Sequence, residues 1–591
     1  MKPRHVIGSI VLATAACSGD PQPSDEPIEC VAKPVQAPGA ATFVDISSAS
    51  GIQARNFTAA PATPIPINDH SRLAFADLDG DGCDEIVAHS LYPNAQAGVP
   101  FTHLVFKSGC DGTFTEVSAA SGLADVQAGF FAFGDVDNDG DQDCFAGLDI
   151  PLAGKASSLW LNDGSGHFTE QPGSGVEGPS GNTVHANAVF ADFNGDARLD
   201  LFIGAGHTSY AAPDELLLGR GDGTFMRTTL GGTVASPSNG SVACDYDDDG
   251  DLDIFVSVYG VSLGGAQNLL YQNDGAAGFK NVAVETGFAS LATGNYWIPA
   301  TGLGTALEPG RGPGQYIGSN GFGLACEDSD RDGDLDLVVS AISHPGGDYN
   351  RTWSDPTTLL LNSGAAGGYT FENAWLARRL PYNEGDVDAA MVDFDNDGRM
   401  DISLSRTDKY EAGYTTELQQ GWFGLMHQQA DGTFAALDRA VGFTDEDRGP
   451  GTKGAQNHAW SDVDRDGDLD LLIGARDQGG GRANLLFRND LGDQHHWLAL
   501  RMVGDGTAIN RDAIGTRVTI TSGDVKLVRE VKSSRGTYNS MDTRVLYFGL
   551  GELGCGFDVE VRWPDGTAES FKPAQTQIDR IATITYGASI E

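Results

Sequence analysis

The nine-residue stretch "DVDRDGDLD" at residues 462–470 decides the fold of this chain, because six variants of it precede it in the sequence. These variants are "DLDGDGCDE" (77–85), "DVDNDGDQD" (135–143), "DFNGDARLD" (192–200), "DYDDDGDLD" (245–253), "DSDRDGDLD" (328–336) and "DFDNDGRMD" (393–401). Neighbouring copies begin 53 to 83 residues apart. A motif repeated at such intervals is typical of solenoids and propellers, in which each copy belongs to one structural unit.

The chemistry of the motif predicts a calcium loop. Side-chain oxygens at positions 1, 3, 5 and 9, with a backbone carbonyl at position 7, are the ligands that Ca²⁺ binds in sets of about six to eight. Position 6 is Gly in six copies, which permits a sharp turn, and Ala197 replaces it in the third copy. The third copy also has Asn194 at position 3, and the first has Glu85 at position 9. We expect the weakest sites in these two loops.

The sequence thus predicts up to seven Ca²⁺ ions, one in each loop, and we expect most of them to brace the fold. The residue at position 7 is expected to bind through its carbonyl oxygen. The predicted ligands are, loop by loop, Asp77, Asp79, Asp81, Cys83 and Glu85; Asp135, Asp137, Asp139, Asp141 and Asp143; Asp192, Asn194, Asp196, Arg198 and Asp200; Asp245, Asp247, Asp249, Asp251 and Asp253; Asp328, Asp330, Asp332, Asp334 and Asp336; Asp393, Asp395, Asp397, Arg399 and Asp401; and Asp462, Asp464, Asp466, Asp468 and Asp470.

The motif is not an EF-hand, which requires Glu at position 12 and a helix after it. Position 12 is apolar in every copy, being Ala88, Ala146, Ile203, Val256, Val339, Leu404 and Ile473. The segments after the loops, such as "LFIGAG" (201–206) and "IFVSVY" (254–259), are short and β-branched, which is typical of strands. Each unit is therefore predicted to be a strand, a loop and a second strand.

A second recurring element supplies two more strands to each unit. Apolar runs end in a Gly-rich turn and an aromatic residue in "LWLNDGSGHF" (159–168), "LLLGRGDGTF" (216–225), "LLYQNDGAAGF" (269–279) and "LLLNSGAAGGYTF" (359–371). Asn-Asp-Gly and Gly-Asp-Gly sequences favour hairpin turns. Four strands in a unit make a propeller blade. The predicted fold is therefore all-β, a seven-bladed β-propeller with calcium loops plus a small C-terminal β domain.

These loops and turns resemble the FG-GAP or VCBS repeats of integrin-α-type propellers over residues 42–492. The resemblance implies that each metal loop lies at the inner edge of a blade and braces it. The opening "FVDISSASGI" (43–52) echoes "FTEVSAASGL" (114–123), the end of the first unit. We therefore expect residues 43–46 to close the ring by pairing in the last blade.

Residues 493–591 lack the repeat and form a separate predicted β domain. The stretches "NRDAIGTRVTI" (510–520), "YFGLG" (547–551) and "VEVRWPDG" (559–566) resemble the ASPIC/UnbV domain that follows propellers in the cartilage acidic protein family. This combination identifies the chain as resembling a bacterial exported member of that family. The stretch "RGTYNSM" (535–541) departs from the family pattern. From the residues alone, the tail is predicted to be antiparallel, with a turn at Asp565-Gly566.

The charge of the chain excludes nucleic acid as a partner. The sequence holds 82 acidic and 37 basic side chains, a net charge of −45, so a polyanion would be repelled. An anionic membrane surface would be repelled as well, which leaves an N-terminal lipid anchor as the predicted membrane contact. Clustered carboxylates also repel one another, so we expect metal binding and folding to be linked.

The N-terminus predicts export. Residues 1–16 form a lipoprotein-type signal peptide, with a basic start and an apolar run too short to span a bilayer. Cys17 is the predicted lipidation site, and residues 17–41 form a Pro-rich tether. We favour an outer-membrane or cell-surface lipoprotein. Ordinary cleavage after Ala13-Thr14-Ala15 is the alternative, and it would make the protein periplasmic or secreted.

An oxidising compartment allows disulfides to form among the cysteines. Cys83 and Cys110, which lie 27 residues apart in one repeat, are the predicted pair. Cys244 and Cys326 fit equally well as buried small hydrophobic residues.

The sequence contains no metalloprotease, phosphate-loop or nucleophile-elbow motif. The leading hypothesis is a monomeric, non-enzymatic, calcium-binding propeller outside the cytoplasm that recognises protein or glycan ligands. A lyase or hydrolase acting on extracellular polysaccharide is the second hypothesis, with residues 284–327 and 340–392 as the place for its cleft. A structural role in envelope assembly is the third.

Overall fold

The structure is a computed structural model of the chain. It describes residues 33–34, 36–52, 72–88, 103–149, 154–178, 184–206, 212–259, 266–275, 278–291, 321–341, 357–380, 386–406, 423–443, 457–474, 484–536, 539–551, 556–572, 578–588 and 590. The predicted signal peptide, Cys17 and most of the tether lie outside these ranges. So does much of the two stretches, 284–327 and 340–392, that were considered for a cleft.

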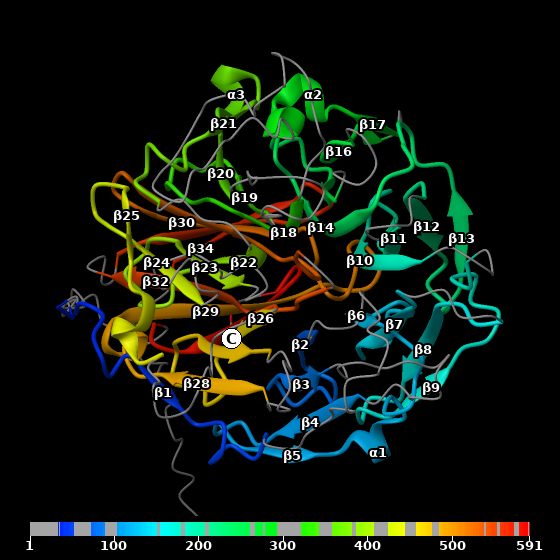
Figure 1. Cartoon of the computed structure of the whole chain (residues 1–591), viewed down its shortest axis with the longest axis horizontal. Helices are drawn as coiled ribbons and strands as arrows, with labels where there is room; N and C mark the ends of the chain where they lie inside the picture. Colours follow the sequence, from blue (N-terminus) through cyan, green and yellow to red (C-terminus); the bar gives the residue numbers. More distant parts are fainter. Residues whose placement is uncertain are drawn as a thin grey trace, which may run out of the picture.

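Repeated four-stranded antiparallel sheets surround a central axis, and the first strand of each sheet is innermost (Figure 1). This arrangement confirms the prediction of an all-β propeller. Over the described residues, the sheets in chain order are β2 (Leu73–Ala76), β3 (Glu85–Ala88), β4 (Leu104–Ser108) and β5 (Phe114–Glu116); β6 (Phe130–Gly134), β7 (Asp143–Gly147), β8 (Ser158–Asn162) and β9 (Phe168–Glu170); β10 (His185–Ala191), β11 (Asp200–Ala205), β12 (Glu215–Gly219) and β13 (Phe225–Thr228); β14 (Ser238–Cys244), β15 (Asp253–Val258), β16 (Leu269–Asn273) and β17 (Phe279–Asn281); β18 (Gly321–Glu327), β19 (Asp336–Ala341), β20 (Thr358–Asn362) and β21 (Phe371–Asn373); β22 (Asp386–Val392), β23 (Asp401–Arg406), β24 (Gly424–Gln428) and β25 (Phe434–Ala436); and β26 (His458–Ser461), β27 (Asp470–Ile473) and β28 (Leu485–Asn489), which β1 joins. We number these seven sheets, and the acidic loop in each, from one to seven.

The ring closes with strands from opposite ends of the propeller sequence. Strand β1 (Phe43–Asp45) pairs antiparallel with β28, with Phe43 opposite Asn489. The prediction that this N-terminal stretch completes the last sheet is confirmed. The ring of Phe43 stacks on the ring of Phe443 at a centroid distance of 4.8 Å, so packing also holds the closing strand in place.

Burial explains the strand patterns of the sequence. Every residue of β10 and of β15 is buried, because the inner strands are covered on both faces by neighbouring sheets. The outermost strand of a sheet is mostly exposed, and in β13 only Phe225 is buried. The Phe that begins the outer strand is buried in β5, β9, β13 and β25 and half-buried in β17 and β21, so it helps to fix that strand to its sheet.

Helices are few and short in the described ranges. They are α1 (Ser118–Ser121), α2 (Ala283–Thr286), α3 (Gly364–Gly367), η4 (Phe288–Leu291), η6 (Asp438–Val441) and η7 (Gly492–Gln494). None of them is long and apolar enough to cross a bilayer.

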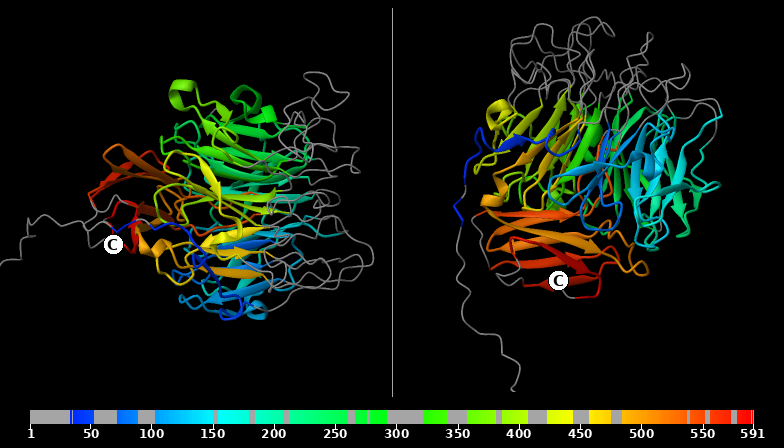
Figure 2. Two further views of the ribbon diagram at one scale, coloured as in Figure 1. Left: turned by 60° about the vertical axis from the view of Figure 1, so that its left-hand side comes forward. Right: turned by 90° about the horizontal axis from the view of Figure 1, so that it is seen from below.

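The C-terminal region forms two further sheets at one end of the ring (Figure 2). One has the order β32-β29-β35 and the other the order β31-β30-β33-β34. Their strands are β29 (His496–Val503), β30 (Arg517–Ser522), β31 (Val525–Glu530), β32 (Leu546–Gly551), β33 (Asp558–Arg562), β34 (Ala568–Phe571) and β35 (Ile581–Thr585). Strands β29 and β35 are parallel, so the expectation of a purely antiparallel tail is wrong. The predicted turn at Asp565-Gly566 joins β33 and β34.

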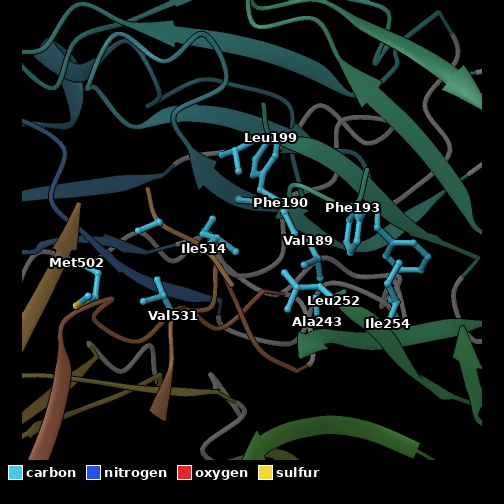
Figure 3. Packing of buried hydrophobic residues seen from close by; sticks show 14 of the residues in the cluster. Val189, Phe190, Phe193, Leu199, Ala243, Leu252, Ile254, Met502, Ile514 and Val531 are labelled. Atoms are coloured by element: carbon cyan, nitrogen blue, oxygen red, sulfur yellow. The ribbon is translucent and has the colours of Figure 1, made fainter. Parts of the chain in front are cut away.

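One buried hydrophobic cluster joins the second, third and fourth sheets to the C-terminal region. Figure 3 shows Met502, Ile514 and Val531 of the C-terminal region with Phe190 and Leu252 of the third and fourth units, and all five are buried. A shared core of this kind removes apolar surface from water on both sides. The two parts are therefore packed as one body.

A segment between β31 and β32 enters the centre of the ring. This plug segment comprises the described residues 531–536 and 539–545. Phe75 of β2 donates its N–H to the carbonyl of Met541 at 2.9 Å, and Ala188 of β10 donates to the side chain of Asn539 at 2.7 Å. Arg535 reaches Asp388 of β22 at 3.0 Å. Since these strands are the first of different sheets, the plug segment lies on the propeller axis.

Two disulfides join described residues. Cys83 pairs with Cys110, as predicted, and ties the first acidic loop to the turn after β4. Cys244 at the end of β14 pairs with Cys326 of β18, which links the fourth and fifth sheets. The sequence had left the state of this second pair open.

Removing the charge of Arg535 is expected to destabilise the protein. Its guanidinium is buried against Asp388 and Asp542, and breaking a buried pair typically costs about 3–5 kcal/mol. Arg535→Met should lower the free energy of unfolding by this amount in chemical denaturation with calcium present. Lys572→Met, which removes an exposed pair with Asp558, should cost less than about 1 kcal/mol. Equal losses in the two variants would contradict the role of the plug.

Candidate metal centres

The first carboxylate of each acidic loop shapes the loop. In the second loop, Asp135 accepts the backbone N–H of Asp139 at 3.0 Å and that of Gly140 at 2.9 Å. The same pair of bonds, from positions 5 and 6, recurs in the third, fourth, sixth and seventh loops. These bonds turn the chain so that the side chains at positions 3, 5 and 9 gather on one side.

The carboxylate at position 9 ties the loop to its sheet. Asp143 accepts the N–H of Val136 at 3.1 Å and the N–H of Asn162 at 2.9 Å. It thereby joins the start of its loop to the end of the third strand. Glu85 makes the corresponding bonds in the first loop, so its longer side chain fills the role of Asp.

Several loop carboxylates are buried with an oxygen that no described residue satisfies. The side-chain oxygens without a hydrogen-bond partner belong to Asp77, Asp79, Asp137, Asp247, Asp330, Asp395, Asp401, Asp464 and Asp468. In the first, second and fourth loops, oxygens of positions 1, 3 and 9 lie within 4.8 Å of one another. A buried polar atom without a partner is costly, and a converging set of oxygens is what a hard cation binds. The residues present therefore fit the predicted calcium.

The same burial disfavours the charged form of these groups when no cation is bound. Burial, and to a lesser extent repulsion from neighbouring carboxylates, raises the pKa of Asp135 to about 7 and that of Asp143 to about 8. The pKa values of Glu85, Asp200 and Asp466 rise to about 8 for the same reasons.

Basic side chains distinguish the loops from one another. Lys107 pairs with Asp79 of the first loop, and Arg378 lies 2.7 Å from Asp330 of the fifth. Arg198 and Arg399, at position 7 of the third and sixth loops, each pair with the carboxylate at position 5. These contacts supply part of the positive charge that an ion would otherwise supply. The expectation that the first and third loops are weak sites stays a prediction.

An amide bridge between sheets was not anticipated from the sequence. Asn162, at the end of β8, donates its side-chain N–H to the carbonyl of Leu78 at 2.7 Å, so the second sheet holds the first loop. The same bridge to position 2 of the preceding loop is made by Asn273, Asn362, Gln428 and Asn489. The sequence predicts only a turn for the Asn of the Asn-Asp-Gly stretches, and it does not predict this hydrogen bond to the neighbouring sheet.

The C-terminal region covers the face that carries the acidic loops. Arg501 lies 2.8 Å from Asp77 of the first loop, and Arg562 pairs with Asp245 of the fourth. Tyr547 donates its hydroxyl to Asp462 of the seventh loop at 3.0 Å. These contacts all reach position 1, whose carboxylate also shapes the loop. No sequence signal indicated them, because they join residues that are 85, 317 and 424 positions apart.

His458 of β26 lies just before the seventh acidic loop. It is fully buried between Ser403 and Ser405, and burial holds its pKa well below the usual value. It is therefore a packing residue. His70, His89, His207 and His344 lie outside the described residues.

Comparison with known proteins finds similarity over most of the chain. A family model described as "ASPIC and UnbV" matches residues 506–591. Cartilage acidic protein 1 of Xenopus tropicalis is 24% identical over 509 residues, which cover 77% of this chain and 73% of the frog protein. The protein of the same name from Mus musculus is 26% identical over 270 residues, 45% of this chain and 37% of the mouse protein. The chain is similar to cartilage acidic protein 1, and its residues 506–591 match the ASPIC/UnbV family.

Among solved structures, BBS1N in complex with ARL6DN covers 76% of this chain and 97% of its own, with 10% identity and a TM-score of 0.38. The alignment with the mouse relative spans little more than a third of that protein. The ASPIC/UnbV match includes Arg517, Tyr547 and Arg562, which contact the acidic loops, whereas Arg501 lies just before the matched residues.

Stability in the absence of metal should fall as the pH rises. The unfolded carboxyls titrate near pH 4, whereas several folded ones titrate near pH 7 to 8, so the folded state binds protons more tightly. With a chelator, the melting temperature should therefore decrease between pH 5 and pH 8. Saturating calcium should remove most of this decrease. A chelated protein whose melting temperature rises over this range would contradict the burial argument.

Asp137→Asn should remove one calcium ion per chain. The substitution keeps the shape of the side chain but removes charge from position 3 of the second loop, where one oxygen lacks a partner. Equilibrium dialysis with metal analysis measures the stoichiometry. Asp565→Ala, in the exposed turn of the C-terminal domain, is the control and should leave the stoichiometry unchanged. An unchanged count in Asp137→Asn would refute the ligand assignment.

Proposed function

We propose that this chain is an exported, calcium-stabilised propeller that recognises an extracellular protein or glycan and catalyses no reaction. The observation that carries the proposal is the set of buried, converging and unsatisfied carboxylate oxygens in the acidic loops. Groups arranged in this way are stabilised by a resident cation and are poorly suited to proton transfer with a substrate. They support a role for the loops in stability and leave recognition to other surfaces.

Calcium supplies positive charge that offsets the carboxylates it binds. The residues that would hold it are those at positions 1, 3, 5 and 9 of each loop, with the carbonyl at position 7. Position 1 already accepts two backbone N–H groups and position 9 accepts two more, as in Asp135 and Asp143. These bonds orient the oxygens before an ion arrives, which reduces the cost of binding.

The disulfides support export. Disulfides persist in oxidising compartments and are rare in the cytosol. The Cys83–Cys110 and Cys244–Cys326 bonds therefore suit a protein outside the cytoplasm. In the proposal, Cys17 carries a lipid that anchors the chain at the cell surface, and the secreted or periplasmic form is the alternative.

The position of the C-terminal domain indicates which face of the propeller is open to a ligand. The C-terminal domain lies on the face with the acidic loops, and the plug segment fills the centre of the ring (Figure 2). A ligand is thus excluded from that face and from the axis. We assign recognition to the opposite face of the propeller, which the C-terminal domain leaves uncovered. In this proposal the protein acts as a monomer.

The position of Lys33, at the end of the predicted tether, indicates which face of the propeller would point away from a membrane. Lys33 donates to the carbonyl of His495 at 3.0 Å and lies 3.3 Å from Asp579, so the chain leaves the body beside the C-terminal domain. An anchor at Cys17 would then hold the C-terminal domain toward the membrane. The proposed recognition face would point away from the cell.

A glycan-array and extracellular-protein screen of the exported chain, with calcium and with a chelator, tests the proposal. We expect binding that requires calcium and leaves the ligand intact in product analysis. Cleavage of a glycan would overturn the non-enzymatic role and favour the polysaccharide enzyme. Binding to envelope components alone would favour structural assembly.

A further inference from the structure

One disulfide joins the first acidic loop to the hairpin turn of its own sheet. Cys83 is position 7 of the loop, and Cys110 lies in the turn between β4 and β5. In the second sheet the same two places hold Asp141 and Gly164, and a β-carbon on this glycine would lie 2.7 Å from Oδ2 of the aspartate. The same closeness recurs between Gly221 and Arg198, Gly275 and Asp251, and Gly364 and Asp334. The first sheet thus turns a steric contact of its neighbours into a covalent bond.

The backbone of Cys110 has the conformation of the glycine that it replaces. Its φ is 60°, and that of Gly164 is 76°. This left-handed region favours glycine, because the β-carbon of any other residue is crowded there. A cysteine in this turn is therefore strained, and the strain is accepted in a position from which its sulfur reaches Cys83.

The first loop has fewer internal hydrogen bonds than most of the others. Within its described residues, Asp77 accepts one backbone N–H of the loop, from Gly82 at 3.0 Å. The corresponding Asp135 of the second loop accepts two. The first loop therefore depends more on the disulfide for its shape.

The disulfide holds the part of the loop that carries predicted calcium ligands. The N–H of Cys83 donates to Oδ1 of Asp81 at 3.0 Å, and its carbonyl is the predicted ligand at position 7. Fixing Cys83 therefore orients two ligands of the first site, its own carbonyl and the carboxylate of Asp81.

The two sulfur atoms of this bond have opposite electrostatic surroundings. Nη1 of Arg465, in the seventh loop, lies 3.7 Å from Sγ of Cys83, whereas Oδ1 of Asp81 lies 3.9 Å from Sγ of Cys110. A nearby cation stabilises a thiolate, and the more stable thiolate is the better leaving group in disulfide exchange. Cys83 is buried and Cys110 is half-buried, so an incoming thiol reaches Cys110 and displaces Cys83.

The second disulfide lacks this access. Cys244 is 0% exposed and Cys326 is 1% exposed, so neither sulfur can be approached from solvent in the folded protein. Disulfide exchange requires access to one of the two sulfurs. The two bonds of the chain therefore differ in their reactivity toward thiols.

We infer that the Cys83–Cys110 bond is a thiol-reducible site that controls the calcium affinity of the first loop. This inference rests on the proposed role of the loops as calcium sites. The thiolate of a dithiol reductant attacks Sγ of Cys110, the S–S bond breaks, and its electron pair leaves on Sγ of Cys83 beside Arg465. The second thiol of the reductant then displaces Cys110 from the mixed disulfide. The reductant loses two electrons and two protons and becomes a disulfide, and the protein gains two thiols.

Graded treatment of the full, calcium-loaded chain with dithiothreitol tests the inference. One portion is alkylated and mapped by mass spectrometry, and the other is dialysed against limiting calcium for metal analysis. We expect Cys83 and Cys110 to become thiols while Cys244 and Cys326 stay bonded. One calcium ion per chain should then bind at least about tenfold more weakly, as when a group that orients a metal ligand is lost.

The double variant Cys83→Asp/Cys110→Gly is the matched control, because it installs the pair that the second sheet has in Asp141 and Gly164. Its calcium binding should not respond to dithiothreitol. The measurement on the wild type stands by itself if this variant fails to fold.

Arg465 is tested as a positioning residue through the rate of reduction. Arg465→Met should slow the reduction of the Cys83–Cys110 bond at least about threefold, because the leaving thiolate loses its cation. Arg465→Lys keeps the charge and should restore most of the rate.

Two results would overturn the inference. The first is reduction of both disulfides at the same rate, and the second is an unchanged calcium affinity after Cys83 and Cys110 have become thiols. In either case, calcium binding by the untreated chain would leave the proposed function standing. An untreated chain that binds no calcium would refute both.

Discussion

The structure depends on the close packing of carboxylates away from water. Each acidic loop places several of them around one point, where burial disfavours their charge. The loop shape nevertheless requires them, because Asp135 and its counterparts accept the N–H groups that turn the chain. The fold therefore needs positive charge at these points. Part of it comes from Lys107, Arg378 and other protein cations, and the remainder is the proposed role of metal ions.

This need for positive charge also explains how the parts of the molecule are joined. The amide bridge from Asn162 reaches into the loop of the preceding sheet, and Arg501 and Arg562 of the C-terminal region reach the first and fourth loops from below the ring. Each loop is thus a joint shared by two sheets and, at several positions, by the C-terminal domain. A disturbance in one loop is transmitted to its neighbours through bonded contacts, so the propeller and the C-terminal domain are linked energetically as well as by the core in Figure 3.

The repeat made the architecture predictable, since a nine-residue motif with strand-like flanks has few solutions besides a propeller. A local rule also sufficed for the Asp565-Gly566 turn, and the likeness of residues 43–52 to residues 114–123 sufficed for the pairing of Phe43 with the last sheet. The contacts that the sequence did not reveal are long-range. The Asn162 bridge, the Arg535 plug and the position of Arg465 beside Cys83 each depend on which strands and loops are neighbours. The residues around a position in a single sequence do not indicate which distant segments will lie next to it in the fold.

The closing strand has a consequence for how the protein is made. Phe43 pairs with Asn489, so the last sheet stays incomplete at its outer edge until the two ends of the propeller meet. In a chain exported from its N-terminus, this edge strand emerges first and its partner emerges more than 400 residues later. Contacts of such sequence separation form slowly, and an unpaired strand edge invites association with other chains. Because β1 is only three residues long, the edge of β28 that stays unpaired until β1 adds is short, and the opportunity for mispairing is small.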